Sequence, residues 1–254
     1  MKPTVRPIRL LQWGSHEIAG HPLEEELVSS VVVVGGTSGL GKEVARFYAG
    51  RGDEVVLTGR DAGRAAAVAK ETGAARGLAL DLSRPQGIKD ALAEVGRVDS
   101  LVLAAVARDH NSIDTYDMEA AQHLLTMKFV GYTETVHALR DRLHDDSALV
   151  VFGGQAKERP YPGALTVATM NAGVTGLVRA LATELAPIRV NGLHPGIVGD
   201  SPQWKDKSLD AVVERTPTGR TATMADVVDA VDFLLRNRSV NGIDLAVDGG
   251  WLLR

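Results

Sequence analysis

The sequence contains no cysteine among its 254 residues. Disulfides, thiolate metal ligands and a cysteine nucleophile are therefore excluded. This absence suits a reducing compartment, and we expect a cytoplasmic protein. No apolar run approaches the roughly 20 residues that a membrane-spanning helix needs, so no membrane partner is expected. The first 30 residues include basic side chains but no continuous apolar stretch, which is unlike a secretory signal.

The sequence also lacks an excess of one charge. It has 28 lysines and arginines against 32 aspartates and glutamates, for a formal net charge of -4. Without a basic surplus, nucleic acid is not an expected partner. No group of histidine, aspartate and glutamate has metal-ligand spacing, so we expect no metal site. The hydrophobic share of 44% is enough for the core of one large domain.

Short β-branched runs alternate with longer amphipathic segments along most of the chain, which is typical of βα units on a parallel sheet. The unbroken apolar run Val31-Val32-Val33-Val34 indicates a strand buried on both faces. The pattern predicts an α/β fold, a single Rossmann-type, doubly wound parallel sheet of seven strands with helices on both faces. Residues 1–30 are interpreted as an N-terminal extension and residues 31–254 as one nucleotide-binding domain. The predicted strands cover residues 31–34, 54–58, 77–82, 101–106, 148–152, 189–193 and 243–247; the main helices cover 39–50, 61–71, 88–95, 116–143, 164–185 and 224–235.

A glycine-rich loop follows the first predicted strand and opens a helix. A dinucleotide pyrophosphate needs close approach of the backbone, which glycine allows, and the N-terminus of the helix adds free N–H donors and partial positive charge. A glycine loop alone is weak evidence, but the strand before it and the helix after it make a nucleotide site the favoured interpretation over a tight turn. The expected phosphate-binding residues are Gly35, Thr37, Ser38, Gly39, Leu40 and Gly41.

The loop has the spacing Gly-x-x-x-Gly-x-Gly, and at this point the chain resembles the short-chain dehydrogenase/reductase family over about residues 31–250. Other landmarks of that family follow in order: Asp81-Leu82, Arg189-Val190-Asn191, His194-Pro195-Gly196 and Val247-Asp248-Gly249-Gly250. The resemblance implies that Asp81 and Leu82 bracket the adenine and that Pro195 and Gly196 border the nicotinamide. It also places Ala104, Ala105, Asn171 and Val198 at the cofactor.

Thr58-Gly59-Arg60 ends the second predicted strand, where NAD sites usually carry a carboxylate and NADP sites an arginine. A guanidinium group suits the 2′-phosphate of NADP(H), so we expect NADP(H) as cofactor. The alternative is that Arg60 is an ordinary surface charge. Asp61 is expected to cap the next helix.

The residues that normally perform catalysis in the family are missing. The family uses an Asn, a Ser, a Tyr and a Lys, and these positions correspond here to Lys128, Gly154, Val167 and Asn171. Valine and glycine have no side-chain proton to donate, so the standard mechanism is not available. The chain resembles an atypical bacterial subgroup that keeps the glycine motif and lacks these residues; Lys128-Phe129-x-Gly131, Asn171 and Trp204 carry that similarity.

Asn and Lys are exchanged between two positions rather than simply lost. Asn171 can hydrogen-bond the nicotinamide ribose, and a buried Lys128 would have a lowered pKa that suits an acid. Both are therefore candidate catalytic residues. The alternative is that Lys128 pairs with a carboxylate or extends to solvent, and the scarcity of unpaired functional lysines favours that alternative.

The substrate is expected at the same sheet edge. Gly154, Gln155 and Tyr161 follow the fifth predicted strand, and Trp204 lies in the segment that covers the substrate in the family. The helices predicted at residues 116–143 and 164–185 correspond to those that pair in family oligomers, which implies a homodimer or homotetramer.

Three functions remain open. The first is an NADP(H)-dependent oxidoreductase acting on a small carbonyl or alcohol with a non-standard proton donor. The second is a non-redox enzyme, an isomerase or cyclase, with the nucleotide as scaffold. The third is a catalytically silent NADP(H)-binding module. The complete cofactor motif favours the first, although a fold alone does not establish an activity.

Overall fold

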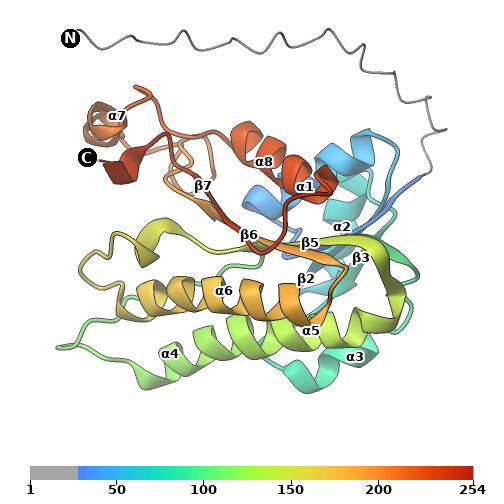
Figure 1. Cartoon of the computed structure of the whole chain (residues 1–254). Coiled ribbons are helices and arrows are strands. Elements are labelled where there is room, and N and C mark those ends of the chain that lie inside the picture. Colours follow the sequence, from blue (N-terminus) through green and yellow to red (C-terminus); the bar gives the residue numbers. More distant parts are fainter. Residues whose placement is uncertain (1–27, 254) are drawn as a thin grey trace, which may run out of the picture.

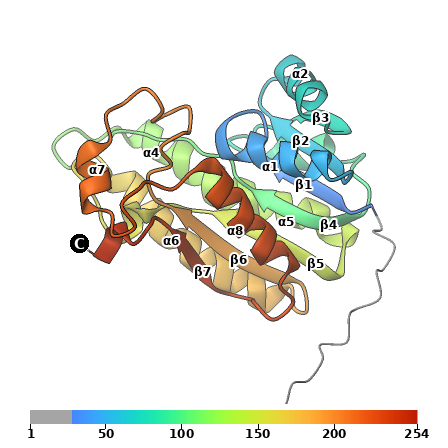
Figure 2. The same ribbon diagram turned by 90° about the horizontal axis from the view of Figure 1, so that it is seen from above.

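The computed structural model describes residues 28–253, and in that part the strands form one seven-stranded parallel sheet. The strand order is β3-β2-β1-β4-β5-β6-β7, so the chain reverses direction across the sheet between β1 and β4 (Figures 1 and 2). This arrangement confirms the predicted Rossmann-type fold. The strands are β1 (Ser30–Val34), β2 (Glu54–Gly59), β3 (Arg76–Ala79), β4 (Val98–Leu103), β5 (Leu143–Phe152), β6 (Arg189–Pro195) and β7 (Asp244–Val247).

Helices cover both faces of the sheet, because the buried strands present apolar side chains alternately to each face. Helices α1, α2 and α8 cover one face of the sheet, and α3, α5 and α6 cover the other (Figure 1). Val31 and Val33 belong to the core cluster of the first face, and Val32 and Val34 to that of the second. The helices are α1 (Gly39–Gly50), α2 (Ala62–Thr72), α3 (Ile88–Ala91), α4 (Met118–Leu125), α5 (Tyr132–Leu139), α6 (Leu165–Glu184), α7 (Asp210–Arg215) and α8 (Met224–Arg236).

The helix predicted over residues 116–143 is interrupted, so that prediction was wrong in its middle and at its end. A π-helical turn, Thr126–Gly131, separates α4 from α5, and β5 already begins at Leu143. Hydrophobic periodicity does not distinguish an α-helix from one with a π turn, since the apolar face is only locally displaced. The turn brings Lys128 and Gly131 inward, where both are buried.

Two predicted strands and one helix end earlier than expected. β3 ends at Ala79 and β4 at Leu103, while α3 ends at Ala91. The apolar residues that follow these strands continue toward the carboxyl edge of the sheet, with Ala104 N–H still donating to Val34 O at 2.9 Å. Because these residues are apolar, the sequence pattern predicted strands that are longer than those observed.

Two glycine-to-alanine variants provide a matched test of the π turn. A Cβ on Gly131 would lie 2.4 Å from the backbone oxygen of Leu82, whereas one on Gly176 in α6 would meet nothing within 4 Å. We expect Gly131→Ala to lower the free energy of unfolding by about 1 to 3 kcal/mol, and Gly176→Ala to raise it by about 0.5 to 1 kcal/mol. Urea denaturation measures both. Equal stabilities would show that the Leu82 contact does not constrain the turn.

The predicted N-terminal extension, residues 1–30, lies outside the described residues except for its last three, and Ser30 already belongs to β1. Among the described helices, α6 is long and apolar enough to meet the length and composition criteria for a membrane span. Its inward face, however, contributes Val167, Met170 and Val174 to the core, as expected for the central helix of a packed domain.

Candidate functional site

The predicted site residues surround a single cavity of about 860 Å³ at the carboxyl edge of the sheet. Loops that follow β1, β2, β4, β5 and β6 line it, which is where ligands bind in open α/β sheets. The structure brings together Gly35, Thr37, Ser38, Gly39, Leu40, Gly41, Arg60, Asp81, Leu82, Ala104, Ala105, Lys128, Gly154, Gln155, Tyr161, Asn171, Pro195, Gly196, Val198 and Trp204.

The glycine loop packs closely against the end of β4 and against itself, and it is open to the cavity at the start of α1. Gly35 has φ +84°, and a Cβ there would lie 2.5 Å from the Cα of Ala105. A Cβ on Gly41 would lie 2.3 Å from Gly35 O. Gly39, with φ +53°, faces open space at the start of α1. The loop therefore leaves room for a phosphate at a helix N-terminus, which fits a dinucleotide.

Arg60 and Asp81 lie at the β2–β3 end of the cavity. Arg60 is exposed at its rim, and Asp61 caps α2 by accepting from Arg64 N–H at 2.7 Å, as the sequence predicted. Burial disfavours the charged form of Asp81, but hydrogen bonds from the hydroxyl and N–H of Ser83 outweigh it. They hold the pKa of Asp81 below its ordinary value, so the carboxylate stays an acceptor.

At the opposite end, α6 brings Asn171 against Gly154. A Cβ on Gly154 would lie 3.0 Å from Asn171 Nδ2, so the position next to this amide has no side chain. Asn171 is buried and makes no side-chain hydrogen bond within residues 28–253, which leaves its amide available to a ligand. Val167, one turn earlier, contributes only apolar surface to the wall.

Lys128 enters the cavity from the π turn and is 2% exposed. Its Nζ lies 3.1 Å from Tyr132 Oη and 3.4 Å from Ala105 O, and 4.5 Å from the centre of the Tyr132 ring. Within the described chain no carboxylate pairs with it, so the favoured alternative, an ion pair or a solvent-facing lysine, was wrong. Burial lowers the pKa of Lys128 to about 7, close to neutrality.

Comparison with known proteins identifies the fold's family. The model of a family described as enoyl-(acyl carrier protein) reductase matches residues 34–252. Carbonyl reductase family member 4 of Xenopus tropicalis is 32% identical over 87% of this chain and 97% of its own length. A solved structure described as a short chain dehydrogenase/reductase family protein is 31% identical, with a TM-score of 0.78 over 89% of this chain and 98% of that one. The chain belongs to the short-chain dehydrogenase/reductase family.

A 3-oxoacyl-[acyl-carrier-protein] reductase of Bos taurus is 30% identical over 86% of this chain and 95% of its own length. These relatives are named reductases, and the family uses nicotinamide cofactors on small molecules. The cavity described above therefore belongs to an oxidoreductase fold of this family. Gly154 and Val167 line this cavity together with Asn171, and neither residue offers a hydroxyl group.

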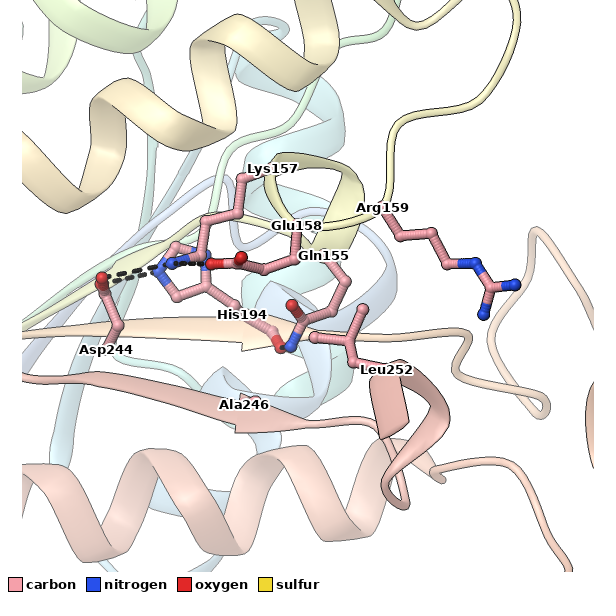
Figure 3. A pocket seen from close by; sticks show the side chains of 8 residues that line it. All are labelled: Gln155, Lys157, Glu158, Arg159, His194, Asp244, Ala246 and Leu252. Carbon is pink, nitrogen blue, oxygen red and sulfur yellow. Dashed lines mark hydrogen bonds and ion pairs between the residues drawn. The ribbon is translucent and has the colours of Figure 1, made fainter. Parts of the chain in front are cut away.

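A second pocket of about 470 Å³ lies beside β7 (Figure 3). His194 Nε2–H donates to Asp244 Oδ1 at 2.8 Å, and Lys157 Nζ lies 3.3 Å from Asp244 Oδ2 and 3.2 Å from Glu158 Oε1. These charges satisfy one another and join β6, β7 and the segment after β5. Burial lowers the pKa of His194 despite the nearby carboxylate. We interpret this network as structural, since it holds the backbone beside Pro195 in place.

The sequence did not single out several residues that shape the main cavity. Tyr132 contacts Lys128, and Trp251 reaches the cavity from the C-terminal end with Arg159 stacked 4.6 Å over its ring. The four-residue spacing of Lys128 and Tyr132 was a signal that could have been used. Trp251 carried none, because the path of the chain after β7 depends on tertiary packing.

The remaining candidates fall into different environments. Tyr161 is half exposed at the rim, and Gln155 is buried with its amide nitrogen donating to His194 O at 3.0 Å. Trp204 lines the cavity, with Lys207 Nζ 4.5 Å over its ring. Within residues 28–253, no group of three or more acidic, histidine or cysteine side chains is placed to hold a metal ion.

Proposed function

We propose that this protein is an NADP(H)-dependent oxidoreductase that interconverts a small carbonyl compound and its alcohol, with Lys128 in place of the usual tyrosine as proton donor. The observation that carries the proposal is the continuity of one cavity. It joins the glycine loop and Arg60 at one end to Asn171 and Lys128 at the other. Lys128 is buried and has no carboxylate partner among the described residues.

The residues present fit a phosphorylated dinucleotide. Gly35, Gly39 and Gly41 leave space for the pyrophosphate, and Arg60 supplies a guanidinium group for a 2′-phosphate. Asp81 remains ionised as an acceptor near the adenine end. When bound, NADPH supplies the hydride for the carbonyl carbon.

The proton comes from this chain. In its ammonium form Lys128 donates a proton to the carbonyl oxygen as negative charge develops there, and in the reverse direction the neutral amine accepts one. Asn171 orients the ligand through its free amide. Trp204 and Trp251 limit water access over the apolar wall formed with Val167 and Met170.

The lack of hydroxyl groups at Gly154 and Val167 keeps a non-redox enzyme, an isomerase or cyclase, as the second candidate. Such an enzyme would use the same cavity with an unchanged nicotinamide. A silent binding module would bind the nucleotide and convert nothing. Consumption of NADPH distinguishes the oxidoreductase from the other two, and product formation without it distinguishes the non-redox enzyme from the silent module.

Calorimetric titration with NADPH and NADH, followed by a panel of small carbonyl compounds, tests the proposal. We expect NADPH to bind at least about 10-fold more tightly than NADH, and its absorbance to fall only when substrate is present. Tight NADPH binding without any turnover would favour the silent module. Absence of binding to either nucleotide would contradict the cofactor assignment itself.

We also infer a homodimer or homotetramer. Met118 of α4, Val130 of the π turn and Leu165 of α6 are exposed apolar side chains on the helices that pair in the family. Sedimentation velocity on the full chain distinguishes these states from a monomer.

A further inference from the structure

Lys128 and Tyr132 form a pair that mirrors the family's missing one. The family's Tyr-x-x-x-Lys positions on α6 hold Val167 and Asn171 here, while Lys128-x-x-x-Tyr132 lies on the π turn and α5. The π turn, α5 and α6 all pack on the same face of the sheet, so the same two side-chain types occur four residues apart in reverse order on neighbouring helices. Unlike a pattern in sequence alone, this pair is in contact, with Lys128 Nζ 3.1 Å from Tyr132 Oη.

Tyr132 is fixed at the inner end of this pair. It is fully buried, and its hydroxyl donates to Ala105 O at 2.6 Å, with Leu103 O at 3.0 Å. The Tyr132 hydroxyl therefore donates its one proton to these backbone carbonyl groups, and its oxygen remains free to accept a hydrogen bond from Lys128. Burial raises the pKa of Tyr132 well above its ordinary value, and its side chain does not line the main cavity. Tyr132 is not placed to give its proton to a ligand.

Two of the three hydrogen-bonding directions of the Lys128 amine have protein partners. An ammonium group has three N–H donors, and Tyr132 Oη and Ala105 O lie within reach of two of them. Tyr132 does not line the cavity, whereas Lys128 and Ala105 both do. Within residues 28–253 no further hydrogen-bond partner engages the amine, which leaves its third direction, an N–H bond in the charged form or a lone pair in the neutral form, available to a ligand in the cavity.

We propose that Lys128 and Tyr132 are a catalytic amine–phenol dyad whose roles are exchanged relative to the family: the amine transfers the proton and the phenol positions the amine. The transfer breaks an N–H bond of the Lys128 ammonium and forms an O–H bond on the ligand oxygen, leaving a neutral amine. The ligand's identity as a carbonyl compound rests on the proposed function, but the dyad itself can be tested without turnover.

Burial and the contact with Tyr132 determine the pKa of Lys128. The other ionisable side chains that line the cavity are His123 of α4, Arg108 of the β4–α4 loop, Arg159 and Tyr161 after β5, and Arg60 and Asp81 at the β2–β3 end; α6 contributes the neutral Asn171. Neither His123 nor Arg108 contributes to the lowered pKa of Lys128, for which burial is the cause. The phenol oxygen accepts from the ammonium, so it stabilises the charged form.

The direct test follows the Lys128 amine by NMR in protein labelled at lysine with ¹³C and ¹⁵N, with the signal assigned by its absence in Lys128→Gln. We expect the ammonium in the parent protein to titrate near pH 7, against an ordinary pKa of 10.5. In Tyr132→Phe it should titrate about one pH unit lower, because the acceptor for the ammonium is lost. The ring and its packing are retained in that variant.

Tyr48→Phe is the matched control. Tyr48 is also a buried tyrosine whose hydroxyl has a polar partner, Asp232 Oδ1 at 3.2 Å, but it lies on α1 on the other face of the sheet. Its loss should leave the Lys128 titration unchanged while lowering stability. Two results would contradict the proposed dyad. One is titration of Lys128 near its ordinary pKa, and the other is the same titration midpoint for Lys128 in Tyr132→Phe as in the parent protein.

Kinetics with a carbonyl substrate provide the second readout. In Tyr132→Phe we expect kcat to fall about 10-fold with an unchanged KM for NADPH, and the decline of kcat with rising pH should begin at lower pH. An unaltered pH profile would overturn the positioning role. If the NMR titration behaves as expected but no carbonyl is reduced, the proposed function fails and the dyad stands.

Discussion

Replacing Lys128 with methionine is expected to lower kcat for carbonyl reduction by about 100- to 10,000-fold. Methionine has a similar length and no proton to donate, and the Lys128 side chain that it replaces is buried with no carboxylate partner among residues 28–253. The Kd for NADPH should change little, because the glycine loop and Arg60 lie at the other end of the cavity. Steady-state kinetics and calorimetry measure the two quantities separately.

The same variant should be more stable than the parent protein, and the gain should depend on pH. The pKa of Lys128 is about 7 in the folded chain and 10.5 ordinarily, so between these values the unfolded chain binds the extra proton. The destabilisation by Lys128 is therefore complete below about pH 7, decreases as pH rises, and disappears above about pH 10.5. Its full size is on the order of 5 kcal/mol.

Denaturant unfolding of parent protein and Lys128→Met at pH 6, 8 and 10 measures this gain. Lys70→Met, at an exposed position in the last turn of α2, is the control for replacing a lysine, and its effect should be small at every pH. A gain in the free energy of unfolding that does not decrease toward high pH would mean that the pKa of Lys128 is not lowered in the folded protein. A variant that keeps full kcat would exclude Lys128 as the proton donor.

The second large effect concerns the choice of nucleotide. Replacing Arg60 with alanine should weaken NADPH binding about 10- to 100-fold, because a charge-assisted hydrogen bond to phosphate contributes about 1.5 to 3 kcal/mol. NADH has no 2′-phosphate, so its Kd should be nearly unchanged. The preference between the two nucleotides should therefore be lost.

Arg84→Ala is the matched control for this variant. Arg84 is an exposed arginine near the same end of the cavity, 3.7 Å from Asp81, but it does not line the cavity. Its removal should weaken both nucleotides by similar small factors. If Arg60→Ala and Arg84→Ala lower NADPH affinity equally, Arg60 acts only through general charge and is not the 2′-phosphate contact.

The parts of the fold that follow from local chemistry could be predicted from the sequence. The β-branched runs at β1 and β2, the glycine loop before α1 and the Asp61 cap all depend on neighbouring residues, and each lies as expected. The membership of the loops in one cavity also follows, because parallel strands bring their carboxyl ends to one edge.

The parts that depend on long-range packing could not be predicted. The π turn exists where Gly131 meets the Leu82 backbone, two segments that are far apart in sequence. The environment of Lys128 depends on Tyr132 and on Ala105, just after β4. The sequence does not reveal these contacts, which is why it favoured an ion pair or a solvent-facing lysine. The sequence could predict which positions correspond to the family's catalytic residues, but not what Lys128 contacts.

NADPH carrying deuterium at the transferable C4 position, supplied with a carbonyl compound that the protein converts, gives the most direct test. Mass spectrometry of the product should find one deuterium on the former carbonyl carbon, and Lys128→Met should form this product at least about 100-fold more slowly. Product without deuterium, or labelled product formed equally fast by the variant, would contradict hydride transfer assisted by Lys128.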